Sequence, residues 1–166
     1  EVASKLFDIT FTESDDLPKY RDNIRSFIVK DNDEKVIGIF YTDYTLRPNK
    51  GGGAWMNTFR SQSKFNGEVI PLVVNVCNFP PPNSDGVSLL SFEQVETLFH
   101  EFGHGLHGLL SDAQYPSLSG TSVTRDYVEF PSQMMENWAR EPAVIKTFAK
   151  HYKTGEIIPD DLLEKF

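Results

Sequence analysis

The chain has 166 residues, 39% of them apolar and 13% aromatic, so one domain with a hydrophobic core is expected. Its 16 basic and 24 acidic residues give a formal charge of −8, and it has no basic cluster that could neutralise nucleic-acid phosphates or bind an anionic membrane. We therefore expect neither nucleic acid nor membrane among its partners. The single cysteine, Cys77, excludes an internal disulfide and a four-cysteine metal site.

The first half of the chain, residues 1–80, has mainly β-type sequence. Its start, "EVASKLFDIT", is interpreted as the approach to a strand. The segments "SFIVK" and "KVIGIFYTDY" are rich in β-branched and aromatic residues and flank the polar turn "DNDE", which predicts a hairpin from Ser26 to Tyr44. After the glycine-rich connection "RPNKGGGAW", an apolar run from Val69 to Phe79 predicts a buried strand, which three consecutive prolines end.

The second half, residues 91–166, has helical patterns. Ser91 and Gln94 match a capping box, in which a hydroxyl and an amide satisfy free backbone groups at the start of a helix. The helix that follows carries an apolar stripe at spacings of three and four, made of Phe92, Val95, Phe99, Phe102, Leu106 and Leu109.

Two more helices are expected after this one. One is predicted from about Thr124 to Arg140, with Pro131 in its early turns or at a kink. The other is predicted to have Pro142 in its first turn and Gly155 as its C-cap, and the amphipathic "PDDLLEKF" closes the chain. Strands followed by helices predict an α+β fold.

The stretch "HEFGH" in the first helix is the strongest chemical signal. Residues four apart lie on one face of a helix, so His100 and His104 can direct their imidazoles at one point. Glu101 is rotated by about 100° from His100, which places its carboxylate near a water at that point without binding the metal itself. The pattern H-E-x-x-H thus predicts two zinc ligands and a general base.

Two histidines do not complete a catalytic zinc site, which needs three protein ligands and an open position. One zinc-peptidase pattern supplies a third histidine, but here His107 and Leu110 occupy the glycine and histidine positions of that pattern. The second predicted helix offers Asp126, Glu129 and Glu136 instead, and helical spacing does not choose among them.

A simpler explanation has to be weighed, because H-E-x-x-H also occurs by chance on ordinary amphipathic helices that bind no metal. Here the match lies on a capped amphipathic helix, is followed by an acidic helix, and uses two of only four histidines in the chain. This context favours a metal site.

Several motifs together resemble one known family. "NKGGGAWMNTF", "VVNVCNF", "LFHEFGHGLHGLL" and "YPSLSGTSVTRDYVEFPSQMMENWA" are similar to motifs of the thimet-oligopeptidase family of zinc metallopeptidases, and most of all to its bacterial peptidyl-dipeptidases. The resemblance spans nearly the whole chain, yet family members are several times longer. It implies a zincin-like fragment of a catalytic domain, formed by residues 1–166 as one unit, with the third zinc ligand on the second helix.

The resemblance also implies roles for individual residues. His100 and His104 match the histidine ligands of one zinc ion per chain, and Glu129 in "DYVEFPSQ" matches the third ligand. Glu101 matches the general base, which takes a proton from the zinc-activated water and passes it to the leaving amine. Acceptors for the second N–H groups of the histidines are sought among Glu93, Glu96, Asp126 and Glu136.

Contacts to a peptide substrate are expected from two loops. "KGGGAW" lacks the Lys-Ser/Thr ending of a phosphate-binding loop, and by resemblance it lies near the substrate path. The substrate-binding candidates are Gly52, Gly53, Ser119, Gly120 and Thr121. In the family, the groups that stabilise the transition state lie further toward the C-terminus, beyond this chain.

The expected function is zinc-dependent release of C-terminal dipeptides from short peptides. Cleavage of internal bonds by an oligopeptidase is the nearest alternative, and an isolated zinc-binding or structural fragment without turnover is the alternative from another class. Because the remainder of the parent catalytic domain is absent, we expect the chain by itself to have little or no activity. A cytoplasmic location is expected, with a periplasmic one as the alternative, because a signal segment could have preceded the first residue.

Overall fold

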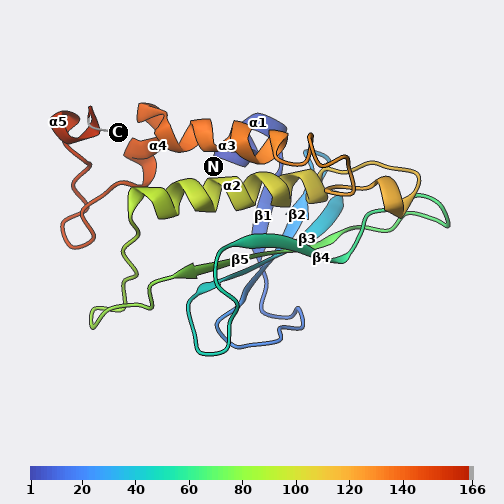
Figure 1. Ribbon diagram of the computed structural model, residues 1–166, viewed down its shortest axis with the longest axis horizontal. Helices are drawn as coiled ribbons and strands as arrows, with labels where there is room; N and C mark the ends of the chain where they lie inside the picture. Colours follow the sequence, from blue (N-terminus) through green and yellow to red (C-terminus); the bar gives the residue numbers. More distant parts are fainter. Residues whose placement is uncertain (165–166) are drawn as a thin grey trace.

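The computed structural model describes residues 1–164, in which helices cover one face of a five-stranded sheet (Figure 1). The sheet order is β1-β2-β3-β5-β4. Its strands are β1 (Thr10–Glu13), β2 (Arg25–Lys30), β3 (Val36–Thr45), β4 (Trp55–Arg60) and β5 (Leu72–Phe79). All neighbouring strands are antiparallel except the central pair β3 and β5, which is parallel.

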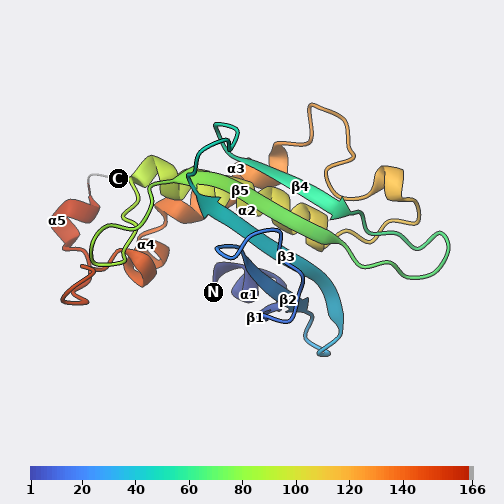
Figure 2. The same cartoon turned by 90° about the horizontal axis from the view of Figure 1, so that it is seen from below.

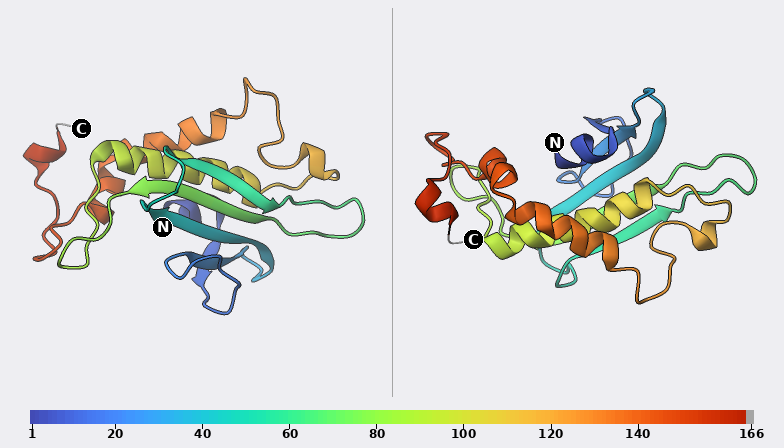
Figure 3. Two further views of the ribbon diagram at one scale, coloured as in Figure 1. Left: turned by 60° about the horizontal axis from the view of Figure 1, so that its bottom comes forward. Right: turned by 90° about the horizontal axis from the view of Figure 1, so that it is seen from above.

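The helices are α1 (Val2–Phe7), α2 (Phe92–Leu109), α3 (Phe130–Arg140), α4 (Pro142–Phe148) and α5 (Asp160–Leu163), with a short 3₁₀ turn, η1, at Pro116–Leu118. Figure 2 shows α2 crossing behind β4 and β5, and Figure 3 shows α3 lying over α2 on the side away from the sheet. This mixed architecture agrees with the predicted α+β class. None of the helices within residues 1–164 combines the length and apolar character that a membrane span requires.

Apolar side chains pack into two clusters, one on each face of the sheet. Between sheet and helices, Phe40 and Val73 pack against Leu106 and Leu109 of α2. On the other face, Ile24, Ile39, Tyr41, Val74 and Val76 form the second cluster. Because β3 and β5 are buried on both faces, their sequences are apolar at successive positions and do not alternate, as expected for central strands.

The predicted hairpin, buried strand and capping box are present. β2 and β3 pair antiparallel around the turn, and β5 forms the buried strand. Ser91 Oγ accepts a hydrogen bond from Gln94 N, and the Gln94 side chain accepts one from Ser91 N. The start of α2 is therefore set by its own sequence.

The chain start differs from the expectation. In place of a direct approach to a strand, residues Val2–Phe7 form α1, and β1 begins only at Thr10. Asp8 ends the helix in the left-handed conformation, with φ 51°. The helix buries Ala3 in the same cluster as Leu106 and Leu109, so tertiary packing stabilises a helix that is too short to be stable alone.

The two later helices are shorter than predicted. The predicted second helix begins at Phe130, not Thr124, because Pro131 lacks a backbone N–H and starts the helix; residues 124–129 form turns. The predicted third helix ends at Phe148, because residues 149–158 fold back on themselves. Lys150 pairs with Ile157, and Gly155, with φ 75°, lies in the turn between them.

Candidate active site

The histidines of the site lie on α2 where that helix crosses the edge of the sheet. Three glycines, Gly103, Gly105 and Gly108, allow close packing: a Cβ on Gly103 would come within 2.6 Å of Ser132 Cα in α3. A Cβ on Gly105 would come within 3.1 Å of the Asn75 side chain in β5. The glycines therefore let α2 lie close to the sheet on one side and close to α3 on the other.

Three ligand-type atoms converge between α2 and α3. His100 Nε2 and His104 Nε2 each lie 3.1 Å from Glu129 Oε2, and all three atoms lie within 4.8 Å of one another. Ligand atoms around tetrahedral zinc with bonds of about 2.0 Å are about 3.3 Å apart. Two imidazole nitrogens and one carboxylate oxygen also form a typical donor set for catalytic zinc, so these residues fit such an ion.

Glu129 is not inside the second helix but at its N-cap position. Ser132, which is fully buried, donates a hydrogen bond to Glu129 Oε2 at 2.9 Å. Burial would raise the pKa of Glu129, but this hydrogen bond and the nearby His104 and His100 lower it. The carboxylate is thus held in its charged form and directed at the histidines.

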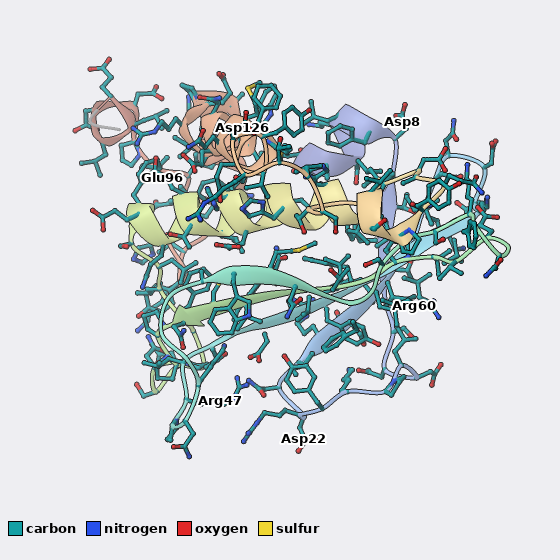
Figure 4. All side chains as sticks on the ribbon, turned by 45° about the vertical axis from the view of Figure 1, so that its right-hand side comes forward. Asp8, Asp22, Arg47, Arg60, Glu96 and Asp126 are labelled. Carbon is teal, nitrogen blue, oxygen red and sulfur yellow. The ribbon has the colours of Figure 1, made fainter. Side chains whose placement is uncertain are left out.

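The second nitrogens of the two histidines differ in their surroundings. His100 Nδ1 lies 2.5 Å from Glu136 Oε1, so one of the four proposed acceptors makes the expected contact. Of the others, Glu96 pairs with Arg140, whereas Glu93 and Asp126 are exposed and Asp126 lies away from the sheet, above α2 (Figure 4). His104 Nδ1 is buried and has no hydrogen-bond partner within residues 1–164.

Glu101 faces the sheet and is only 6% exposed. Its carboxylate accepts a hydrogen bond from the backbone N–H of Met56 in β4, while its Oε2 atom is buried without a partner among the described residues. Burial, helped by the negative charge of Glu129, raises the pKa of Glu101, and His100 and the Met56 N–H oppose that shift. A carboxylate with a raised pKa is suited to take up and release a proton.

The converging groups line a cleft of about 400 Å³ between β4, α2 and the start of α3. Its walls are Ala54, Trp55, Met56, His100, Glu101, His104, Thr121, Val128 and Glu129. Since β4 is an outer strand of the sheet, the cleft runs beside a strand whose outer edge pairs with no other strand within residues 1–164. Such an edge can hold an extended peptide by backbone hydrogen bonds.

The remaining predicted site residues occupy different places. Thr121 lines the cleft, whereas Ser119 and Gly120 are buried behind α2, where both hydrogen-bond to Ser111 Oγ. Gly52 and Gly53 are exposed in the loop that precedes the cleft-lining residue Ala54.

His107 is not one of the three converging ligands. Its ring packs against Tyr127, with 6.3 Å between the ring centroids, and burial lowers its pKa. His107 thus contributes to the packing between α2 and the loop before α3.

Sequence reasoning missed strand β4 and with it the wall formed by Trp55 and Met56. The signal was present, because exposed Trp55, Asn57 and Phe59 alternate with half-buried Met56 and Thr58. This alternating pattern was assigned to the loop because it directly follows three glycines. Ser132, three residues after Glu129, was also not anticipated.

Fold and site together define a domain that presents a His/His/Glu group able to hold a metal ion, beside a buried glutamate and a sheet edge, and this arrangement is typical of metallopeptidases. The sequence matches Peptidase family M3 over residues 1–166. The chain belongs to this family.

Relatives in this family include two kinds of peptidase. The chain is 46% identical to the dipeptidyl carboxypeptidase of Salmonella typhimurium and 44% identical to that of Escherichia coli, over 99% of its own length and 24% of theirs. It is 40% identical to oligopeptidase A of Escherichia coli, over 99% of its own length and 25% of that protein. The chain thus spans about a quarter of the length of these relatives.

Proposed function

We propose that this chain is the zinc-binding part of a peptidase catalytic domain with a zincin-like arrangement, and that residues 1–166 act as one unit. His100, His104 and Glu129 hold one zinc ion, and Glu101 is the general base. The observation that carries the proposal is the convergence of three ligand atoms within 4.8 Å beside a buried glutamate.

The chemistry of peptide hydrolysis assigns a task to each group. When bound, zinc supplies Lewis-acid polarisation of the scissile carbonyl and lowers the pKa of water. Glu101 takes a proton from the attacking water and delivers it to the departing amine nitrogen. The edge of β4 orients the peptide, and Ser132 and Glu136 fix the orientations of Glu129 and His100.

Among family activities, release of C-terminal dipeptides is proposed for the full-length protein. The higher identity to two dipeptidyl carboxypeptidases than to oligopeptidase A supports this choice. Cleavage of internal bonds is the second candidate, supported by the 40% identity to oligopeptidase A. A substrate with an amidated C-terminus separates them, because only an enzyme that requires the free carboxylate rejects it.

Zinc binding tests the metal site directly. We expect the chain to take up about one zinc ion, and His100→Ala to weaken binding more than about 100-fold, since losing even an outer partner of a ligand costs about 10–100-fold. The measurement is competition with a chromogenic chelator. His151→Ala is the matched control, because His151 is exposed and lies outside the cleft. Equal zinc affinity in both variants would rule out the assigned ligand.

Glu101→Gln tests the general base. The chain is exchanged for the matching segment of Escherichia coli dipeptidyl carboxypeptidase, to which it is 44% identical. We expect the chimera to hydrolyse peptides and Glu101→Gln to lower kcat by about 100-fold or more with zinc content unchanged, because general-base catalysis contributes about 10²–10⁴-fold. A glutamine variant with full zinc and undiminished kcat would remove Glu101 from this role.

A further inference from the structure

A buried lysine ties the glycine-rich loop to the ends of the two central strands. The Lys50 side chain is only 3% exposed. Its ammonium donates hydrogen bonds to the backbone oxygens of Cys77 at 2.5 Å, Asp43 at 2.7 Å and Thr45 at 3.1 Å. These acceptors lie at the C-terminal ends of β3 and β5, so a single side chain joins both strands to the start of the loop.

The charge of Lys50 is balanced inside a small ionic cluster. Asp43, 2% exposed, forms an ion pair with Lys50 at 3.0 Å and accepts hydrogen bonds from both terminal nitrogens of Arg47 at 2.5 and 2.8 Å. The Tyr20 hydroxyl donates to the same carboxylate at 2.8 Å. The cluster lies on the face of the sheet opposite α2, where Figure 4 labels Arg47. Within residues 1–164, no hydrogen bond or ion pair joins it to a proposed zinc ligand.

A second side chain fixes the rest of the loop. Asn78, at the end of β5, donates from Nδ2 to the backbone oxygens of Gly51 at 2.7 Å and Gly53 at 2.8 Å. Gly53 has φ 82°, which few other residues adopt readily. Three successive glycines would be mobile if left free, yet this loop is attached by Lys50 at its start and by Asn78 along its length.

The attached loop leads directly into the wall of the cleft. Ala54, Trp55 and Met56 follow it and line the cleft with the histidines. The Met56 N–H also bonds to Glu101. A displacement of the loop would therefore move the start of β4 relative to α2 without touching the ligands themselves.

We propose that Lys50 and Asn78 are positioning residues that fix the beginning of β4 at the distance from the metal group at which an extended peptide fits between them. This inference rests on the proposed function, because it assigns the β4 wall to peptide binding. A purely structural role would stabilise the fold and leave peptide binding unchanged in any variant that still folds.

The test compares two zinc-directed probes on the zinc-loaded chain. Acetohydroxamate reaches only the metal, whereas the hydroxamate of an alanine tripeptide also extends along β4. In Asn78→Ala and Lys50→Met, we expect about tenfold weaker binding of the tripeptide probe, which corresponds to the loss of one or two hydrogen bonds, with acetohydroxamate affinity and zinc affinity unchanged. In the zinc-free chain, backbone hydrogen exchange over residues 51–58 should become faster in the same variants.

Tyr20→Phe is the matched control. It removes one hydrogen bond from Asp43 Oδ2, whereas Lys50 contacts Oδ1, so it should lower stability and leave the ratio of the two probe affinities at its wild-type value. Asn78→Ala decides the question if Lys50→Met does not fold, because Asn78 carries no charge.

Three outcomes would overturn the inference. If Asn78→Ala folds and the ratio of the two probe affinities is unchanged, the positioning role is overturned, whereas the proposed zinc site is unaffected. Equal weakening of both probes also overturns it, because the effect would then lie at the metal. A wild-type chain that takes up no zinc overturns the proposed function and this inference with it.

Discussion

At the scale of single residues, the geometry of the candidate site is set by neighbouring side chains that orient the proposed ligands. Glu129 lies outside regular helix, and its carboxylate is directed by the buried hydroxyl of Ser132. The Ser132 Oγ also lies 2.9 Å from the backbone oxygen of Glu129, so its single proton is shared between the carboxylate and the backbone acceptor. One serine therefore contacts both the main chain and the side chain of the proposed third ligand.

Ser132→Ala should weaken zinc binding by about tenfold, the lower end of the effect of losing an outer partner of a ligand. Without the hydroxyl, the Glu129 carboxylate gains rotational freedom that zinc binding must remove. Chelator competition measures the change, and Ser122→Ala, at an exposed serine, is the control. Identical affinities in the two variants would show that Ser132 does not orient the ligand.

At the scale of elements, the site is formed by the packing of α2 against α3 and β4. The histidines come from α2, Glu129 from the start of α3, and the Met56 N–H from β4. Gly103 determines how closely the two helices approach, because its Cα faces the backbone of Pro131 and Ser132. The distance between the histidines and Glu129 is thus a consequence of helix packing.

Gly103→Ala should disrupt this packing. The added Cβ would lie 2.6 Å from Ser132 Cα and 2.8 Å from the Pro131 backbone oxygen, neither of which can move away alone. We expect a loss of about 1–3 kcal/mol in unfolding free energy, typical of overpacking, together with weaker zinc binding as α3 shifts from α2. Urea denaturation and chelator competition measure the two effects.

The control for this substitution is Gly52→Ala. A Cβ on Gly52 would meet no atom of the described part of the chain within 4 Å. Its zinc affinity and unfolding free energy should stay close to wild type. If Gly103→Ala behaves like Gly52→Ala, close approach of α2 and α3 is not what sets the site.

At the scale of the whole molecule, the buried ionic cluster makes stability depend on pH. Burial would raise the pKa of Asp43, but hydrogen bonds from Arg47, Tyr20 and Lys50 outweigh it and hold that pKa at about 2. An aspartate in the unfolded chain titrates near pH 3.9. A lowered pKa in the folded state stabilises the fold above the unfolded pKa, and this contribution disappears as pH falls from about 4 to about 2.

We therefore expect acid to remove about 2 kcal/mol of stability through this one carboxylate. Urea denaturation at pH 7, 4 and 3 should show Asp43→Asn less stable than wild type at pH 7, with a difference that shrinks below pH 4. Comparison with the variant separates Asp43 from the other carboxylates, which titrate in both proteins. A difference that stays constant to pH 3 would contradict the lowered pKa.

Local patterns in the sequence were sufficient for several elements. The capping box at Ser91, the hairpin of β2 and β3 and the buried run of β5 depend on neighbouring residues or on burial of a continuous segment. The spacing of His100 and His104 likewise followed from helix geometry. For these elements, the local preference of the sequence agrees with the structure that tertiary packing requires.

Other features depend on contacts between segments that are distant in the sequence. Helix α1 buries Ala3 in the apolar cluster that also contains Leu106 and Leu109 of α2. The helix predicted from Pro142 stops at Phe148, and residues 149–158 pair with each other. Helical spacing left three acidic residues open as the third ligand, and in the sequence only the family resemblance selected Glu129. The fold brings Glu129 to both histidines and Glu136 to the far side of His100, and leaves Asp126 exposed.

The sequence by itself determined the helix that presents two histidines and a glutamate on adjacent faces, because i and i+4 positions are neighbours within one helix. Only the tertiary structure decided what surrounds them. Glu129, Met56 and Lys50 lie 25, 48 and 54 positions away in the chain from His104. Their positions depend on glycine-mediated packing of α2 and on hydrogen bonds at the strand ends, which no local periodicity encodes.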